Sequence, residues 1–184
     1  QSVYDSYKNN PKQFVDRINS YGLNKPLGLP IKGEGKPVIP QPGTNRWSGV
    51  ALPWMAFGYG LSVTPLQTLT LYNAVANDGV MVKPIFVSEI KEWNKTIKKY
   101  NTEVINPKIC SQETLDKVQA VLENVVKRGT GSKLYSKDFS MAGKTGTAQV
   151  NYKDKSKLYY ASSFVGYFPA DEPKYSCIIV VHKP

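Results

Sequence analysis

An ammonium group, two hydroxyl groups and a glycine fall within residues 142–149, which read AGKTGTAQ. Lys144 lies two positions before Gly146, and Thr145 and Thr147 flank that glycine. In an extended backbone, these side chains and the open backbone N–H groups can converge on one anionic ligand. The segment therefore has the groups needed to hold a carboxylate beside an acyl centre.

The geometry of a β-strand divides these residues between two faces. Alternate residues share a face, so Lys144 groups with Gly146, and Thr145 groups with Thr147. Gly146 lets a ligand approach the backbone closely. At a sheet edge, the unpaired N–H and C=O groups of the strand can also accept an extended peptide as one more strand. The alternative is an ordinary strand with a solvated lysine.

A phosphate-binding loop is a second interpretation of residues 143–145 (GKT), which match the end of that motif. The motif requires a glycine five positions before Gly143, where the chain has Asp138. It also requires a helix after Thr145, whereas residues 146–150 are typical of a strand. We therefore reject nucleotide binding by this segment.

Start and stop signals predict three helices before this strand. Residues 10–13 (NPKQ) and 64–67 (TPLQ) each place a capping residue before a proline at the first helical position, with a glutamine at the third. Gly22 ends the first helix, and residues 77–79 (NDG) end the second. Ser111 caps the third helix, which ends in a basic turn. The apolar positions at helical spacing are Phe14, Ile18 and Tyr21; Leu66, Leu69, Tyr72 and Ala76; and Leu115, Val118, Leu122 and Val125.

The remaining segments are predicted to be strands and loops. Three strands, at 143–150, 158–168 and 175–182, are separated by a polar loop at 151–157 and by a short connector. Short connectors between sequential strands imply an antiparallel meander.

Two earlier segments lack helical periodicity. Residues 24–53 contain six prolines and predict a long irregular excursion. Residues 85–104 predict a solvated two-stranded hairpin centred on Asn94 and Lys95.

Composition limits the function classes. The 184 residues carry a net charge of +10, but the lysines are scattered, so we expect no nucleic-acid partner. His182 is the only histidine, and Cys110 and Cys177 lack metal-ligand spacing, so we expect neither a metal site nor a cofactor. Cys177 is expected to be a buried small hydrophobe, and a disulfide between the two cysteines is left open. No apolar run is long enough to span a membrane.

Five segments are distinctive in their order and spacing. They are residues 57–67 (FGYGLSVTPLQ), 76–79 (ANDG), 125–131 (VVKRGTG), 142–148 (AGKTGTA) and 163–170 (SFVGYFPA). Together they resemble the transpeptidase domain of class B penicillin-binding proteins, most of all the septal, cell-division type, with the elongation type as the alternative. A Lys-Thr-Gly strand is the third motif of these proteins and of serine β-lactamases. The resemblance implies their α+β fold, an antiparallel sheet with flanking helices, of which residues 1–184 would form the C-terminal portion.

The resemblance also implies a serine-type peptidoglycan D,D-transpeptidase, in which an active serine attacks the penultimate D-Ala of a stem peptide. The acyl group then passes to a neighbouring amine, and β-lactams acylate the same serine. Lys144 would supply positive potential and assist proton transfer. Thr145 and Thr147 would hold the substrate carboxylate, with Thr147 preferred, and the Thr147 N–H would complete the oxyanion hole. Gly146 would admit the substrate.

Partners and location follow from the same resemblance. The implied partners are peptidoglycan stem peptides, β-lactam antibiotics and membrane proteins of cell division or wall synthesis. The implied location is the extracytoplasmic, periplasmic face of the cell membrane, with a transmembrane anchor upstream of this chain.

The family's other two motifs do not occur in a suitable context. Residues 88–91 (SEIK) have the Ser-x-x-Lys spacing but lie in an extended stretch, so we reject Ser88 as the nucleophile, and no Ser-x-Asn is present. In the family both motifs precede the part that resembles residues 5–22. We therefore expect this chain to be the downstream portion of the domain and to be inactive alone, because covalent catalysis needs the serine. The alternative is a non-catalytic peptide-binding or structural module of the cell-wall synthesis machinery.

Overall fold

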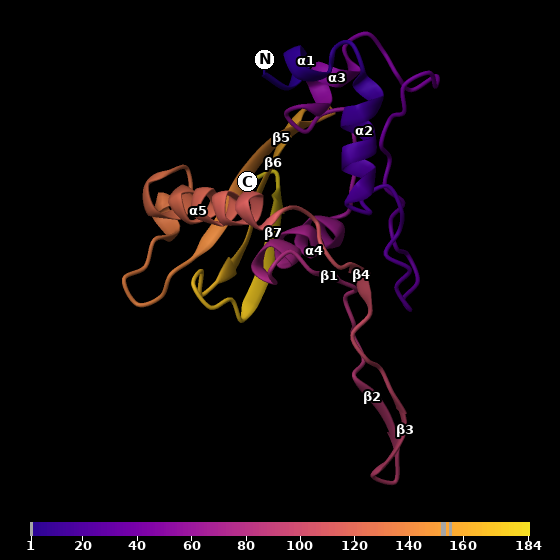
Figure 1. Cartoon of the computed structure of the whole chain (residues 1–184), viewed down its shortest axis with the longest axis vertical. Helices are drawn as coiled ribbons and strands as arrows, with labels where there is room; N and C mark the ends of the chain where they lie inside the picture. Colours follow the sequence, from indigo (N-terminus) through magenta and orange to yellow (C-terminus); the bar gives the residue numbers. More distant parts are fainter. Residues whose placement is uncertain (1, 152–153, 155) are drawn as a thin grey trace. The chain divides into compact units, whose positions relative to one another are not determined.

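The structure is a computed structural model that describes residues 2–151, 154 and 156–184 (Figure 1). The chain divides into two compact units, of which one runs to residue 67 and includes 83–106, and the other comprises 68–82 and 107–184. The helices are α1 (Ser2–Tyr7), α2 (Pro11–Ser20), α3 (Ala51–Met55), α4 (Pro65–Ala76), α5 (Gln112–Arg128) and the short 3₁₀ helix η1 (Ser132–Leu134). The strands are β1 (Met81–Val82), β2 (Glu89–Glu92), β3 (Lys95–Lys99), β4 (Val104–Asn106), β5 (Ala142–Val150), β6 (Tyr159–Phe168) and β7 (Tyr175–His182).

The second unit is built on a three-stranded antiparallel sheet in the order β5-β6-β7. Lys144 of β5 lies opposite Val165 of β6, which lies opposite Ile178 of β7. This order confirms the predicted strands and the antiparallel meander. The physical reason is that short connectors leave successive strands as neighbours. Of the predicted polar loop at 151–157, residues 152, 153 and 155 lie outside the described residues.

One face of this sheet is buried. Val165 and Tyr167 of β6 are only 7% and 1% exposed, and Ala142, opposite Tyr167, is fully buried. Helix α5 packs against β5. The Nδ2 atom of Asn73 in α4 donates a hydrogen bond to Ser176 Oγ of β7 (3.2 Å). The helices therefore hold the β5–β7 sheet from this side.

The other face of the sheet carries exposed apolar side chains, those of Tyr175, Ile179 and Val181. Cys177 lies on the same face because alternate residues of a strand point the same way. It is half-buried, so the prediction of a buried cysteine is wrong, and Cys110 and Cys177 are both free thiols.

Helix α5 begins as predicted. The Ser111 hydroxyl oxygen accepts a hydrogen bond from the backbone N–H of Thr114 (3.3 Å), which satisfies one of the free donors at the helix start. The predicted core positions Val118 and Val125 are only half-buried. The buried side chains are Leu115, Leu122 and Val126. Sequence could not choose between two adjacent valines, because both suit an apolar face equally well.

Helix α4 also begins as predicted, with a reciprocal capping box. Thr64 N donates to Gln67 Oε1 (2.9 Å), and Gln67 N donates to Thr64 Oγ1 (3.1 Å). The predicted apolar face, Leu66, Leu69, Tyr72 and Ala76, is only half-buried. The buried positions are instead Gln67, Thr70, Ala74 and Val75. Apolar residues surround most of this helix, so periodicity alone could not identify the side that faces the core.

In the first unit, α2 ends as predicted near Gly22, which has a positive φ of 75°. The side chain of Asn10 makes no capping hydrogen bond, so the predicted role of that residue is wrong. Residues 24–50 are irregular, as predicted, and α3 begins at Ala51, inside the excursion. The Glu34 carboxylate organises part of this segment by accepting backbone hydrogen bonds from Leu27 and Leu29.

Strands β2 and β3 form the predicted hairpin, and every residue of β3 is exposed. Its turn residues are Trp93 and Asn94, with φ values of 47° and 63°, one position earlier than predicted. Residues 89–91 belong to β2, so the SEIK segment is extended and not helical, as expected.

Candidate functional site

Strand β5 lies at an edge of its sheet. It pairs with β6 along its whole length, and no strand among residues 2–151, 154 and 156–184 pairs with its other side. The backbone donors and acceptors on that side are therefore available to an extended ligand. The expected edge geometry is confirmed, and residues 144–147 lie in the middle of this strand.

The Lys144 side chain is exposed and stays close to its own strand. Its Nζ atom donates a hydrogen bond to the backbone carbonyl oxygen of Thr145 (2.8 Å). The neighbouring residue across the ladder is the buried Val165. The ammonium thus lies beside the Thr145 carbonyl group of the edge strand, where its positive charge favours an anionic ligand.

The two threonines of the motif are in different surroundings. Thr145 Oγ1 lies 2.6 Å from Thr130 Oγ1, a hydroxyl that follows the end of α5. Thr147 is exposed. Both belong to the same face by the alternation of the strand. Thr147 therefore presents an open hydroxyl, whereas the Thr145 hydroxyl is held by a neighbour.

Gly146 faces a close neighbour across the ladder that the sequence did not reveal. A Cβ atom at this position would lie 2.6 Å from Ser163 Oγ, directly across the ladder in β6. This separation is far shorter than a normal van der Waals contact, so a side chain at 146 would push Ser163 or the strand aside. The absence of a side chain therefore lets the Ser163 hydroxyl keep its position and leaves room for a ligand.

A polar contact fixes the entry into β5. Ser140 Oγ donates a hydrogen bond to the Asp171 carboxylate and accepts one from Ala170 N (2.8 Å). The hydrogen bond from Ser140 lowers the pKa of Asp171 below its ordinary value. The segment before the candidate site is thereby tied to the connector between β6 and β7.

Sequence reasoning gave Thr130 and Ser163 no role, although both lie in segments that it singled out. The available signal was a threonine between two glycines immediately after a predicted helix. Their contacts with Thr145 and Gly146 depend on strand register and on the path of the chain after α5, neither of which is visible in the sequence.

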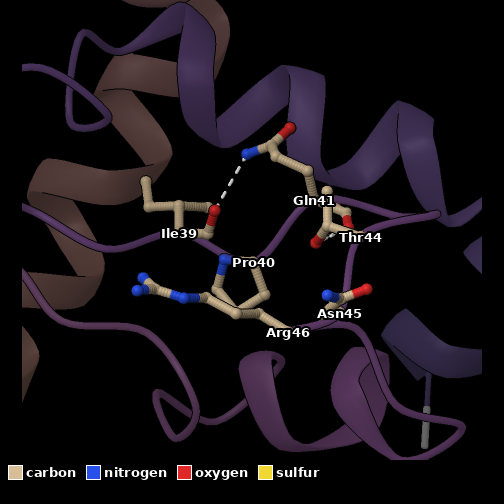
Figure 2. A pocket seen from close by; sticks show the side chains of 6 residues that line it. All are labelled: Ile39, Pro40, Gln41, Thr44, Asn45 and Arg46. Atoms are coloured by element: carbon tan, nitrogen blue, oxygen red, sulfur yellow. Dashed lines mark hydrogen bonds between the residues drawn. The ribbon is translucent and has the colours of Figure 1, made fainter.

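A separate hollow of about 500 Å³ lies in the irregular segment of the first unit (Figure 2). Gln41 Nε2 donates to the Ile39 carbonyl oxygen (3.0 Å), and Gln41 Oε1 accepts from Asn19 Nδ2 of α2 (3.3 Å). Its lining residues are Ile39, Pro40, Gln41, Thr44, Asn45 and Arg46. None of the predicted site residues belongs to this hollow.

Among the described residues, no group of three or more His, Cys, Asp or Glu side chains could hold a metal ion. None of the helices within that same part of the chain is long and apolar enough to cross a membrane.

The family model named penicillin binding protein transpeptidase domain matches residues 4–184. The chain belongs to this family. It is 33% identical over 174 residues to stage V sporulation protein D of Bacillus subtilis, covering 91% of this chain and 26% of that protein. It is 29% identical over 172 residues to the peptidoglycan D,D-transpeptidase FtsI of Escherichia coli, covering 92% of this chain and 27% of that protein.

The fold is likewise that of a penicillin-binding protein. The structure matches penicillin-binding protein 3 of Mycobacterium tuberculosis, solved with aztreonam, with a TM-score of 0.82 and 30% identity. The match covers 95% of this chain and 41% of that one. The expected α+β transpeptidase fold is therefore confirmed. The chain spans about a quarter of the length of the curated relatives it matches.

Proposed function

We propose that the protein carrying this chain is a peptidoglycan D,D-transpeptidase, and that β5 is the wall of its substrate site. The observation that carries the proposal is the edge position of β5, which exposes Lys144, Thr147 and one line of backbone groups together. The family match and the name of the Escherichia coli relative support it.

In this mechanism the substrate peptide lies along the free edge of β5. Lys144 attracts the substrate carboxylate and assists proton transfer, while Thr145 and Thr147 donate hydrogen bonds to that carboxylate. The N–H of Thr147 stabilises the oxyanion that forms when a serine attacks the penultimate D-Ala carbonyl. Terminal D-Ala leaves, and an amine of a second stem peptide then takes the acyl group and releases the serine.

The nucleophile is not in this chain, since no serine here begins a helix with Ser-x-x-Lys spacing. The residues of β5 orient a ligand and polarise its carbonyl, but they form no covalent bond with it. We propose that this chain alone is inactive. We also propose that it is the C-terminal portion of a septal-type domain at the outer face of the membrane, with wall-synthesis membrane proteins as partners.

Covalent labelling with a fluorescent penicillin tests the proposal. The full protein should label, and Lys144→Ala should slow acylation on the order of 10²-fold or more while the protein stays folded. Lys174→Ala is the matched control, because it removes the same charge from an exposed connector. Near-normal acylation of the Lys144 variant would remove this residue from the mechanism.

The fluorescent penicillin also distinguishes an enzyme from a non-catalytic peptide-binding module. For the isolated chain, the missing motifs favour the binding module. Stoichiometric label on this chain alone would show that a nucleophile was overlooked. Absence of label on the full protein would leave only the binding module.

A further inference from the structure

The loop that follows α5 is held tightly on the helix end. The backbone N–H groups of Gly129 and Gly131 both donate to the carbonyl oxygen of Val125 (3.1 and 3.0 Å). A Cβ atom at 129 would lie 2.8 Å from Val125 Cα, and one at 131 would lie 3.2 Å from Val125 O. A side chain at 129 would collide with the backbone and one at 131 would be crowded, so the glycines favour this close return of the chain, which brings Thr130 to β5.

The Thr130 hydroxyl meets a hydroxyl of the candidate site. Its Oγ1 atom is 2.6 Å from Thr145 Oγ1, which is within the range of a strong O–H···O hydrogen bond. A hydroxyl has one donor and two acceptor positions. If Thr145 donates its proton to a bound carboxylate, it can accept the Thr130 proton at the same time. Such a chain of hydrogen bonds strengthens each member.

We propose that Thr130 is a positioning residue for substrate binding, which donates to Thr145 Oγ1 and so aims the Thr145 hydroxyl at the substrate carboxylate. The inference rests on the proposed function and adds a residue to it. Without this partner the Thr145 side chain can occupy other rotamers, and its hydroxyl would be polarised less. The exposed Thr147 has no side-chain hydrogen bond among the described residues, so the two hydroxyls of the motif differ in how far they are pre-oriented.

The test uses the full protein with Thr130→Val, which keeps the side-chain shape and removes the hydroxyl, and Thr130→Ser, which restores it. Each variant is assayed with a stem-peptide analogue that ends in a carboxylate and with the same analogue ending in a neutral amide. We expect Thr130→Val to lower kcat/KM roughly tenfold for the carboxylate substrate, the size of one lost hydrogen bond. The amide substrate should be nearly unaffected, and Thr130→Ser should recover activity to within about twofold.

A double-mutant cycle with Thr145→Val supplies an independent readout. If Thr130 acts through Thr145, then adding Thr130→Val to Thr145→Val should cause no further loss for the carboxylate substrate. Additive losses would overturn the inference. An equal loss for both substrates would also overturn it, because that result indicates a general structural defect. If Thr130→Val does not fold, Thr130→Ala replaces it in both experiments, because it removes the same hydroxyl group with a smaller side chain.

The failure of the inference can be told from the failure of the proposed function. If the unmodified protein is acylated by penicillin and Thr130→Val retains full carboxylate preference, only the role of Thr130 is wrong. If the unmodified protein is not acylated, both the proposed function and the role of Thr130 are wrong.

Discussion

Gly143 of β5 and Gly166 of β6 lie directly opposite each other in the sheet. A Cβ atom at 166 would lie 3.0 Å from Gly143 Cα and would collide with the carbonyl oxygen of Ala142. A Cβ atom at 143 would lie 2.6 Å from Val165 O and would meet the Phe164 ring. The two glycines therefore allow the close approach of β5 to β6 at this point, one residue before Lys144.

Gly166→Ala should destabilise the protein by about 3 kcal/mol, because the added methyl group meets backbone atoms that cannot rotate away. Urea unfolding measures the change in the free energy of unfolding. Gly49→Ala is the control, since a Cβ atom there would have nothing within 4 Å, and its effect should stay within about 0.5 kcal/mol. Equal stabilities for the two variants would show that the sheet adjusts freely.

Tyr167→Phe should stabilise the protein by about 1 kcal/mol at neutral pH. Tyr167 is 1% exposed, and its hydroxyl has no hydrogen-bond partner among the described residues, so the change keeps the packing and removes an unsatisfied polar group. Thermal unfolding at pH 7 measures the effect. The control is Tyr160→Phe, which removes an exposed hydroxyl that accepts a hydrogen bond from Gln149 Nε2. A large loss of stability in Tyr167→Phe would reveal a partner for this hydroxyl.

The same tyrosine predicts a pH dependence. Burial, with a smaller contribution from Glu123, raises the pKa of Tyr167 from 10.0 to about 12. Because the pKa is higher in the folded state, the folded protein favours the neutral phenol. Ionisation of Tyr167 therefore costs no stability below pH 10 and lowers the free energy of unfolding as the pH rises through about 12. Between pH 9 and 12, the free energy of unfolding should fall less steeply for Tyr167→Phe than for the unmodified protein. Parallel curves would contradict the assigned cause.

Gln67→Leu should cost about 2–3 kcal/mol, although leucine is the more apolar residue. Gln67 is 1% exposed, accepts from Thr64 N, and donates to the Lys25 carbonyl oxygen (2.8 Å). Leucine would leave both backbone groups without this partner. Gln112→Leu serves as the exposed-helix control and should change stability by less than about 0.5 kcal/mol in urea unfolding. A neutral Gln67→Leu would mean that water replaces the lost bonds.

Trp93→Asn should leave the hairpin intact and make it more stable. Trp93 is 94% exposed and has a positive φ of 47°, a conformation that asparagine adopts more readily than tryptophan. Amide hydrogen exchange across β3 should become slower. Trp54→Asn is the contrasting variant, because Trp54 packs against Tyr59 with ring centroids 5.7 Å apart, and it should lower stability by about 2 kcal/mol or more. Faster exchange in Trp93→Asn would show that the indole stabilises the turn.

Much of the local structure could be predicted from the sequence because local chemistry decides it. The capping box of Thr64 and Gln67 and the cap at Ser111 act within one helical turn, and both are present. Short connectors likewise make the three C-terminal strands neighbours. Two local predictions were nevertheless wrong: Asn10 makes no cap, and the hairpin turns at Trp93 and Asn94, one position earlier than predicted.

The candidate site could be predicted only in part. Lys144, Thr145 and Thr147 were proposed as site residues because the flanking segments resemble one family, since the tripeptide alone is too common to be informative. The structure places all three in β5, at the edge of its sheet. Thr130 was not assigned a role, because its contact with Thr145 spans fifteen residues and depends on how the chain leaves α5.

The sequence by itself determined the family and the order of the three longer helices, the hairpin and the three C-terminal strands, since these are encoded in motif spacing and local signals. Only the tertiary structure decided which side of α4 is buried, why residues 143, 146 and 166 are glycines, and which hydroxyl accompanies Thr145. These features depend on the register of one strand against another and on the packing of helices on a sheet. Such contacts join residues that are far apart in the chain, so no local pattern can specify them.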